Sequence, residues 1–402
     1  MELSFSSAAL LLLLAAAVVA MVTRRLALPY TVGLVAAGMA ISLLPLAPKI
    51  SLTRELIFDA LLPPLIFEAA FYLRWSQLRR ELPVVLTLAT IGVILSGAVT
   101  ATGMHFLAGW QWPSALVFGS LIAATDPVSV IATLREARAH GRLRLLIEAE
   151  SLFNDGTAAV AFAIAIRFAA GRPFSTVDLF EGLGATVGGA LVCGAAASGM
   201  LLFLATRTED HLVELTFTTV AAYGSFLLAE QLHFSGVLAT IVAGLIIGNT
   251  GTLGALSEHG REAVQSFWEY AAFVTTSLVF LLIGMHEASQ NFAAVWLPSV
   301  VAVVFVVLGR AVAVYPICLF FFRSSLRVSV RHQHALVWCG LRGALALALA
   351  LGIPEELPGR AEIITVTFAV VAFSVFVQGL TMRPLLQVMG EIPRAQRNRH
   401  SA

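Results

Sequence analysis

Apolar segments of about twenty residues recur along the whole chain, separated by short stretches rich in proline, glycine or arginine. Because the hydrocarbon core of a bilayer is roughly 30 Å thick, a helix of this length crosses it once. Breaking the chain at these stretches predicts about thirteen membrane-spanning helices. The predicted spans are 6–23, 26–47, 52–72, 82–108, 112–134, 145–170, 179–206, 211–230, 234–249, 264–285, 293–322, 334–352 and 361–386.

Composition agrees with this pattern. Apolar residues make up 58% of the chain and charged residues 12%, too few to cover a soluble protein of this length. The sequence therefore predicts an all-α polytopic membrane protein, with one membrane domain over 1–390 and a short cytoplasmic tail over 391–402. The arginines are spread over many loops and the net charge is +1, so no nucleic-acid partner is expected. Glu2 stands where a signal peptide carries basic residues, so the first span is read as a membrane helix.

The basic residues fall unevenly between the two sets of loops that alternate along the predicted spans. One set holds eighteen of the 25 Lys and Arg residues, and three lie within spans. The opposite set holds the other four, which are Lys49, Arg54, Arg172 and Arg360. The positive-inside rule then places the amino terminus outside and the carboxyl terminus in the cytoplasm of a cell (inner) membrane.

Thirteen spans divide into two sets of six joined by a linker helix over 179–206. The two sets, about 6–170 and 211–386, then run in opposite directions, as in the inverted repeats of transporters. Under this division the fifth span corresponds to the twelfth. Both contain helix-breaking residues, Thr125-Asp126-Pro127 and Gly340-Leu341-Arg342-Gly343, and broken helices expose backbone groups and helix dipoles to ions.

Ionisable side chains within apolar spans indicate function, because burying them in a membrane costs about 2.5 kcal/mol or more. The richest segment is 148–156, Glu-Ala-Glu-Ser-Leu-Phe-Asn-Asp-Gly. Ser151 and Asp155 are four residues apart and share a helix face, which predicts that they line an ion pathway. Glu150 and Asn154 share a face roughly 100° away, which predicts a contact with another helix and an opposite charge.

Asp126 precedes a proline, so the helix should open at Thr125-Asp126 and free backbone carbonyls there. Its carboxylate either binds an ion or caps the following half-helix. Glu68 follows Pro63-Pro64 and lies either on the pathway or near the cytoplasmic interface. Asp155 is the strongest candidate for the central ion-binding carboxylate.

Two arginines within apolar spans, Arg310 and Arg342, each need an anionic partner. Arg310 is the first candidate to pair with Glu150, and Arg342 is the second. Arg342 alternatively serves Asp126 and the broken helix.

These motifs occur together in one order: Phe67-Glu68, Thr125-Asp126-Pro127, the 150–156 segment and Gly340-Leu-Arg-Gly343. In this combination the sequence resembles sodium/proton antiporters of the NhaP type, in the monovalent cation:proton antiporter-1 family. It is also similar to the membrane domain of animal sodium/proton exchangers. The resemblance implies a homodimer with a dimerisation domain beside a six-helix core domain, which holds two discontinuous crossing helices and moves in elevator fashion.

The resemblance also implies residue roles. Asp155, Asp126, Ser151 and Glu68 match the family's ion-binding residues, and the Thr125 carbonyl is a further ligand for Na⁺. Glu150 with Arg310 matches the family's buried salt bridge. An Asn-Asp pair, here Asn154 and Asp155, implies electroneutral one-for-one exchange of Na⁺ or Li⁺ for H⁺.

The expected partners are therefore a monovalent cation, protons and membrane lipid, with no cofactor. The long regulatory tail of animal exchangers is not expected here.

Three other functions remain open from the sequence. A K⁺/H⁺ antiporter would use the same types of ligand. A channel would need a repeated carbonyl-rich filter, which is not seen in the sequence. An intramembrane aspartyl protease could use Asp126 and Asp155, although the flanking Pro127 and Asn154 fit a cation site better.

Overall fold

The computed structural model describes residues 5–26, 28–44, 52–126, 131, 134, 141–171, 176–250 and 256–392. Within these ranges the chain is helical, with no strand. The first elements are α1 Phe5–Leu26, α2 Tyr30–Ser42, η1 Leu56–Leu61, α3 Leu62–Tyr72, α4 Trp75–Thr87, η2 Leu88–Gly92, α5 Val93–Phe106, α6 Trp112–Ile122, α8 Arg142–Ala169 and α9 Thr176–Ala205. The remaining elements are α10 His211–Gln231, α11 Gly236–Thr250, α12 Glu258–Glu287, η4 Phe292–Val295, α13 Trp296–Phe320, α14 Val330–Trp338, α15 Ala344–Leu351, α16 Arg360–Phe373, η5 Ser374–Gly379 and α17 Leu380–Met389.

A helix occupies each span that the apolar pattern predicts, although α4 begins at Trp75, in a predicted loop. The all-helical membrane fold is confirmed. Eight of the described helices are long and apolar enough to cross a membrane, where α4–α5 and α16–α17 each form one long helix through a π-helical segment. Two spans are interrupted, as their helix-breaking motifs predict. In the span 112–134 the helix α6 ends at Ile122, and residues 127–130 lie outside the described part of the chain. In the span 334–352 the non-helical residues 340–343 separate α14 from α15. The count of thirteen spans stays a prediction.

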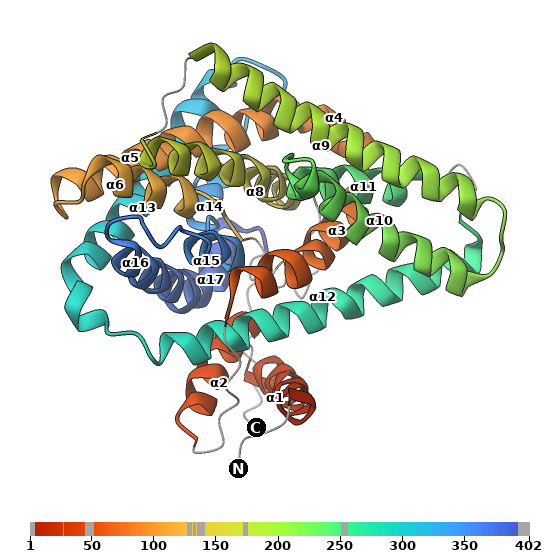
Figure 1. The fold of residues 1–402 in the computed structure, drawn as a ribbon, viewed down its shortest axis with the longest axis horizontal. Coiled ribbons are helices and arrows are strands. Elements are labelled where there is room, and N and C mark those ends of the chain that lie inside the picture. Colours follow the sequence, from red (N-terminus) through yellow and green to blue (C-terminus); the bar gives the residue numbers. More distant parts are fainter. Residues whose placement is uncertain are drawn as a thin grey trace, which may run out of the picture.

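The helices pack in two groups (Figure 1). In one group α12 packs along α2, and α11 packs against α3, α9 and α10. In the other group α5 lies between α6 and α13, α6 packs on α8, and α15 packs on α16. The long α12 runs along the edge of the molecule, with α9 and α10 near one end and α16 near the other.

Two of the contacts between the groups are close and apolar. A Cβ atom at Gly156 of α8 would lie 2.3 Å from a methyl carbon of Leu238 on α11. A Cβ at Gly379 would lie 3.3 Å from a methyl carbon of Val32 on α2. Glycine at these positions lets the two groups approach closely without a polar link.

The pairing of α2 with α12 and of α3 with α11 bears on the predicted repeat. In an inverted repeat of six helices, α2 corresponds to α11 and α3 to α12. The pseudo-symmetry therefore maps the contact of α2 with α12 onto the contact of α11 with α3. This agrees with the repeat, which also stays a prediction.

Candidate functional site: two helix breaks beside a buried carboxylate

Two interrupted helices meet at their breaks. After α6 ends at Ile122, residues 124–126 are not helical, and residues 340–343 are not helical between α14 and α15. The Asp126 N–H donates to the Leu341 carbonyl at 2.8 Å, which joins the two breaks through the backbone. Because non-helical backbone leaves carbonyl and N–H groups without helix partners, this junction is where the fold can offer them to an ion.

Gly343 makes this junction possible. A Cβ atom at Gly343 would lie 1.9 Å from Oδ2 of Asp126, closer than any side chain allows. Gly340 plays a similar part, since a Cβ there would lie 2.8 Å from Nε of Arg310. The two glycines of the 340–343 motif are therefore needed for close approach, and neither has the positive φ that would require glycine on conformational grounds.

The helix α8 packs against α6 and brings Ser151 to the first break. The Ser151 hydroxyl donates to the Thr125 carbonyl at 2.5 Å and accepts from the Thr125 hydroxyl at 3.1 Å. Both residues are buried. Ser151 and Thr125, singled out separately in the sequence, thus form one cluster of oxygen atoms.

Asp155 lies one turn further along the same face of α8. Asp155 as a whole residue is partly buried. Its Oδ1 atom is fully buried and has no hydrogen-bond partner. The charged groups that act on it electrostatically are Asp126 and Glu150, both acidic. A buried acidic oxygen with acidic neighbours favours the arrival of a cation or a proton.

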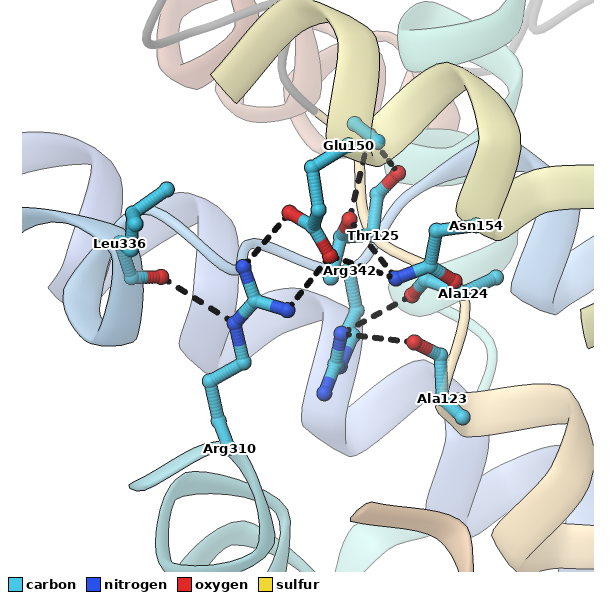
Figure 2. Close-up of polar contacts among 9 residues, drawn as sticks. Ala123, Ala124, Thr125, Glu150, Asn154, Arg310, Leu336 and Arg342 are labelled. Atoms are coloured by element: carbon cyan, nitrogen blue, oxygen red, sulfur yellow. Dashed lines mark hydrogen bonds and ion pairs between the residues drawn. The ribbon is translucent and has the colours of Figure 1, made fainter. Parts of the chain in front are cut away.

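Glu150 forms a buried ion pair with Arg310 of α13 (Figure 2). Nη1 and Nη2 of Arg310 each lie 2.7 Å from one Glu150 oxygen, and Nε donates to the Leu336 carbonyl at 3.1 Å. Asn154 donates to Glu150 at 3.2 Å and to the Thr125 hydroxyl at 3.3 Å. Of the two arginines considered as partners of Glu150, Arg310 makes the pair.

Arg342 binds backbone carbonyls instead of a carboxylate. Its Nη1 atom donates to the Ala123 carbonyl at 3.2 Å and to the Ala124 carbonyl at 3.1 Å (Figure 2). These carbonyls lie at the carboxyl end of α6, where the helix dipole is negative. A buried guanidinium therefore satisfies the end of the first interrupted helix from within the second.

Glu68 is partly buried on α3, a helix that packs against α8. Its part in ion binding stays a prediction. Pro127 lies outside the described residues. The carbonyls of Ala123, Leu336 and Leu341 were not predicted as partners, because no side-chain pattern marks a backbone acceptor.

Comparisons with known proteins identify the family of this chain. A sequence model described as "Sodium/hydrogen exchanger, transmembrane" matches residues 10–388. The chain belongs to the sodium/hydrogen exchanger family. The resemblance drawn from the motifs is thereby confirmed.

Relatives within this family share much of the chain. It is 38% identical to "Na(+)/H(+) antiporter ApNhaP" of Aphanothece halophytica, over 93% of this chain and 72% of the relative. It is 36% identical to "Na(+)/H(+) antiporter NhaP" of Pseudomonas aeruginosa, over 83% of this chain and 81% of the relative. The structure of the sodium proton antiporter MjNhaP1 from Methanocaldococcus jannaschii has the same fold, with a TM-score of 0.77 at 21% identity over 98% of this chain and 100% of that chain.

Proposed function

We propose that this protein is a secondary transporter that exchanges Na⁺, and also Li⁺, for H⁺ across the membrane. The observation that carries the proposal is the buried, unpartnered Oδ1 of Asp155 beside the junction of two helix breaks. Family membership supports the reaction, since the relatives are named as Na⁺/H⁺ antiporters.

In this proposal Asp155 binds either the cation or a proton, never both. Ser151, the Thr125 carbonyl, Asp126 and Glu68 supply further oxygen ligands, which suit a hard cation. A loaded carboxylate is neutral and can move through an apolar boundary, whereas the empty carboxylate carries a charge and cannot do so at low cost. Competition for one carboxylate therefore couples the two fluxes at one Na⁺ per H⁺ and moves no net charge.

Asn154 supports this stoichiometry. Its side chain is an amide, which does not titrate, so it carries no proton through the cycle. The amide donates to Glu150 and to the Thr125 hydroxyl. With Glu150 paired to Arg310 and Glu148 paired to Arg144, Asp155 is left as the carboxylate of α8 that exchanges its ligand.

The two helix groups support an elevator movement. The group containing α5, α6, α8 and α13 to α17 holds the candidate site, and its boundary with α2 and α11 includes close apolar contacts at Gly379 and Gly156. We propose that this core domain slides past the other group, which is the dimerisation domain of a homodimer in the cell (inner) membrane. The amino terminus is then outside and the carboxyl terminus in the cytoplasm.

The proposal is tested in everted membrane vesicles that hold a quenched pH dye. Addition of NaCl or LiCl should reverse the quenching within seconds, and choline chloride should not. Reversal by KCl alone would show a K⁺/H⁺ antiporter instead. No response to any of these cations would contradict cation/proton exchange.

A further inference from the structure

A second buried carboxylate without a hydrogen-bond partner lies on α12, outside the residues of the candidate site. Glu287 is the last residue of the thirty-residue helix α12 and is 2% exposed. Both of its carboxylate oxygens are buried and lack a hydrogen-bond partner. The described residues include no other acidic side chain with both oxygens in this state.

His286, the adjacent residue, does not supply a positive charge. Its Nε2 atom lies 3.3 Å from the Leu52 backbone nitrogen, which can only donate, so Nε2 accepts. Its Nδ1 atom lies 3.2 Å from the Leu282 carbonyl, which can only accept, so Nδ1 carries the hydrogen. This pattern is that of a neutral imidazole.

The other elements packed around this end of α12 offer no cation either. The helix α2 has no charged residue. On α16, Arg360 donates to the carbonyls of Leu351 and Ile353, and Glu362 accepts from the Trp110 indole. Arg54, just before η1, lies over the Phe58 ring and against Gly352. Asp59 of η1 and Glu55 before it are acidic and exposed.

The helices α1, α3 and α10 also pack against α12, at earlier residues of that helix. Phe67 of α3 contacts Trp268, and the Trp268 indole donates to the Thr218 hydroxyl of α10. Arg24 of α1 lies near Tyr30, whose ring stacks on Phe273. Trp268 precedes Glu287 by nineteen residues, or roughly 28 Å at 1.5 Å per residue. Among the described residues, no donor lies within hydrogen-bonding distance of either Glu287 oxygen.

An ionised carboxylate in this position would be doubly unfavourable. It would be buried without a partner, and it would sit at the carboxyl end of a helix, where the dipole is already negative. A metal cation would need several converging oxygens, but no group of three metal-ligating side chains occurs in the described residues. The neighbouring oxygens of Ser289 and Gln290 are already engaged, with the His286 carbonyl and with Thr365.

We propose that Glu287 is a second proton-binding site, separate from Asp155, and that it carries its proton in the conformation described here. The site lies where α12 meets α16, at the boundary of the two helix groups. Gln290 accepts from Thr365 there, and the His286 ring stacks on Phe368. Loss of the proton would place a charge in this contact and weaken it.

The proposal is tested by infrared spectroscopy of the whole protein in lipid at pH 7. A protonated carboxyl group gives a C=O stretching band that a carboxylate lacks. Glu287→Gln should remove one such band from the wild-type spectrum, with exchange activity within about twofold of wild type. An unchanged carboxyl region would show that Glu287 is ionised and would overturn the proposal.

Two control variants separate the alternatives. Lys49 lies in a stretch outside the described residues, and Lys49→Gln should leave the Glu287 band intact in size and position. Loss or gain of that band in Lys49→Gln would mean that Lys49 sets the charge of Glu287. Asp155→Asn should also retain the band, so that this site and the proposed exchange site succeed or fail separately.

A measurement on the wild-type protein guards against misfolding of the variant. Dicyclohexylcarbodiimide reacts with protonated carboxyl groups in apolar surroundings. Glu287 should be modified at least tenfold faster than Glu150, which is equally buried but paired with Arg310. Equal or faster modification of Glu150 would contradict the assignment.

Discussion

Arg310 and Glu150 form a buried bidentate ion pair, in which both nitrogen–oxygen distances are 2.7 Å. The pair joins α13 to α8, and these two helices belong to opposite halves of the predicted repeat. Asn154 extends it to Thr125 at the first helix break. We therefore propose that the pair holds the scaffold around the candidate ion site and does not contact the ion itself.

Removal of one member of this pair should destabilise the protein by about 3 kcal/mol or more, because the other charge is left buried and alone. Glu150→Gln and Arg310→Met should each lower the thermal unfolding temperature in detergent. The double variant should recover part of that loss, since two neutral side chains leave no isolated charge. Additive losses in the double variant would show that the two side chains act independently.

Arg342 should be important for the first helix break. Arg342→Met leaves the Ala123 and Ala124 carbonyls without their donor, at a cost of about 1–3 kcal/mol for each buried group left unsatisfied. Arg342→Lys keeps a donor and the charge, and should lose less stability. The comparison is made by thermal unfolding of both variants. Equal stability of Met and Lys variants would contradict this role.

Gly343 should tolerate no side chain. In Gly343→Ala the new methyl group would meet Asp126, so the two breaks must separate and exchange should fall at least tenfold. Gly188→Ala is the control, because Gly188 lies on α9 with nothing within 4 Å of an added Cβ. Na⁺-driven proton flux in vesicles measures both. Normal flux in Gly343→Ala would show that the close approach is dispensable.

Movement between the two helix groups can be tested by cross-linking. Cysteines at Gly156 and Leu238 would join α8 to α11 across the boundary, and oxidation should stop exchange until a reductant is added. Cysteines at Ala70 and Gly244 join α3 to α11 within one group, and their cross-link should leave exchange largely intact. Exchange that continues with the first pair fully cross-linked would rule out sliding at this boundary.

Much of the fold follows from local sequence. Apolar length predicts where the helices lie, and Gly340 and Gly343 mark the second break. Helical spacing places Glu150 with Asn154, and their hydrogen bond appears in the structure. The spacing also sets Ser151 and Asp155 apart on another face.

Contacts between distant segments were harder to predict. The choice between Arg310 and Arg342 as partner of Glu150 depends on how α13 and α14 cross, which no local pattern encodes. The same holds for the backbone acceptors of Arg342. Glu287 was missed because it stands at the end of a span, where a carboxylate is usually solvated, and only the packed structure shows it buried.

The central claim is that Asp155 binds both exchanged ions. Asp155→Asn keeps the shape of the side chain and removes its charge, so Na⁺-driven proton flux in proteoliposomes should fall to the level of empty liposomes. Ser151→Ala, on the same face of α8, should keep exchange at a higher Na⁺ requirement, since it loses one ligand only. Normal Na⁺-driven proton flux in correctly folded Asp155→Asn would contradict the account.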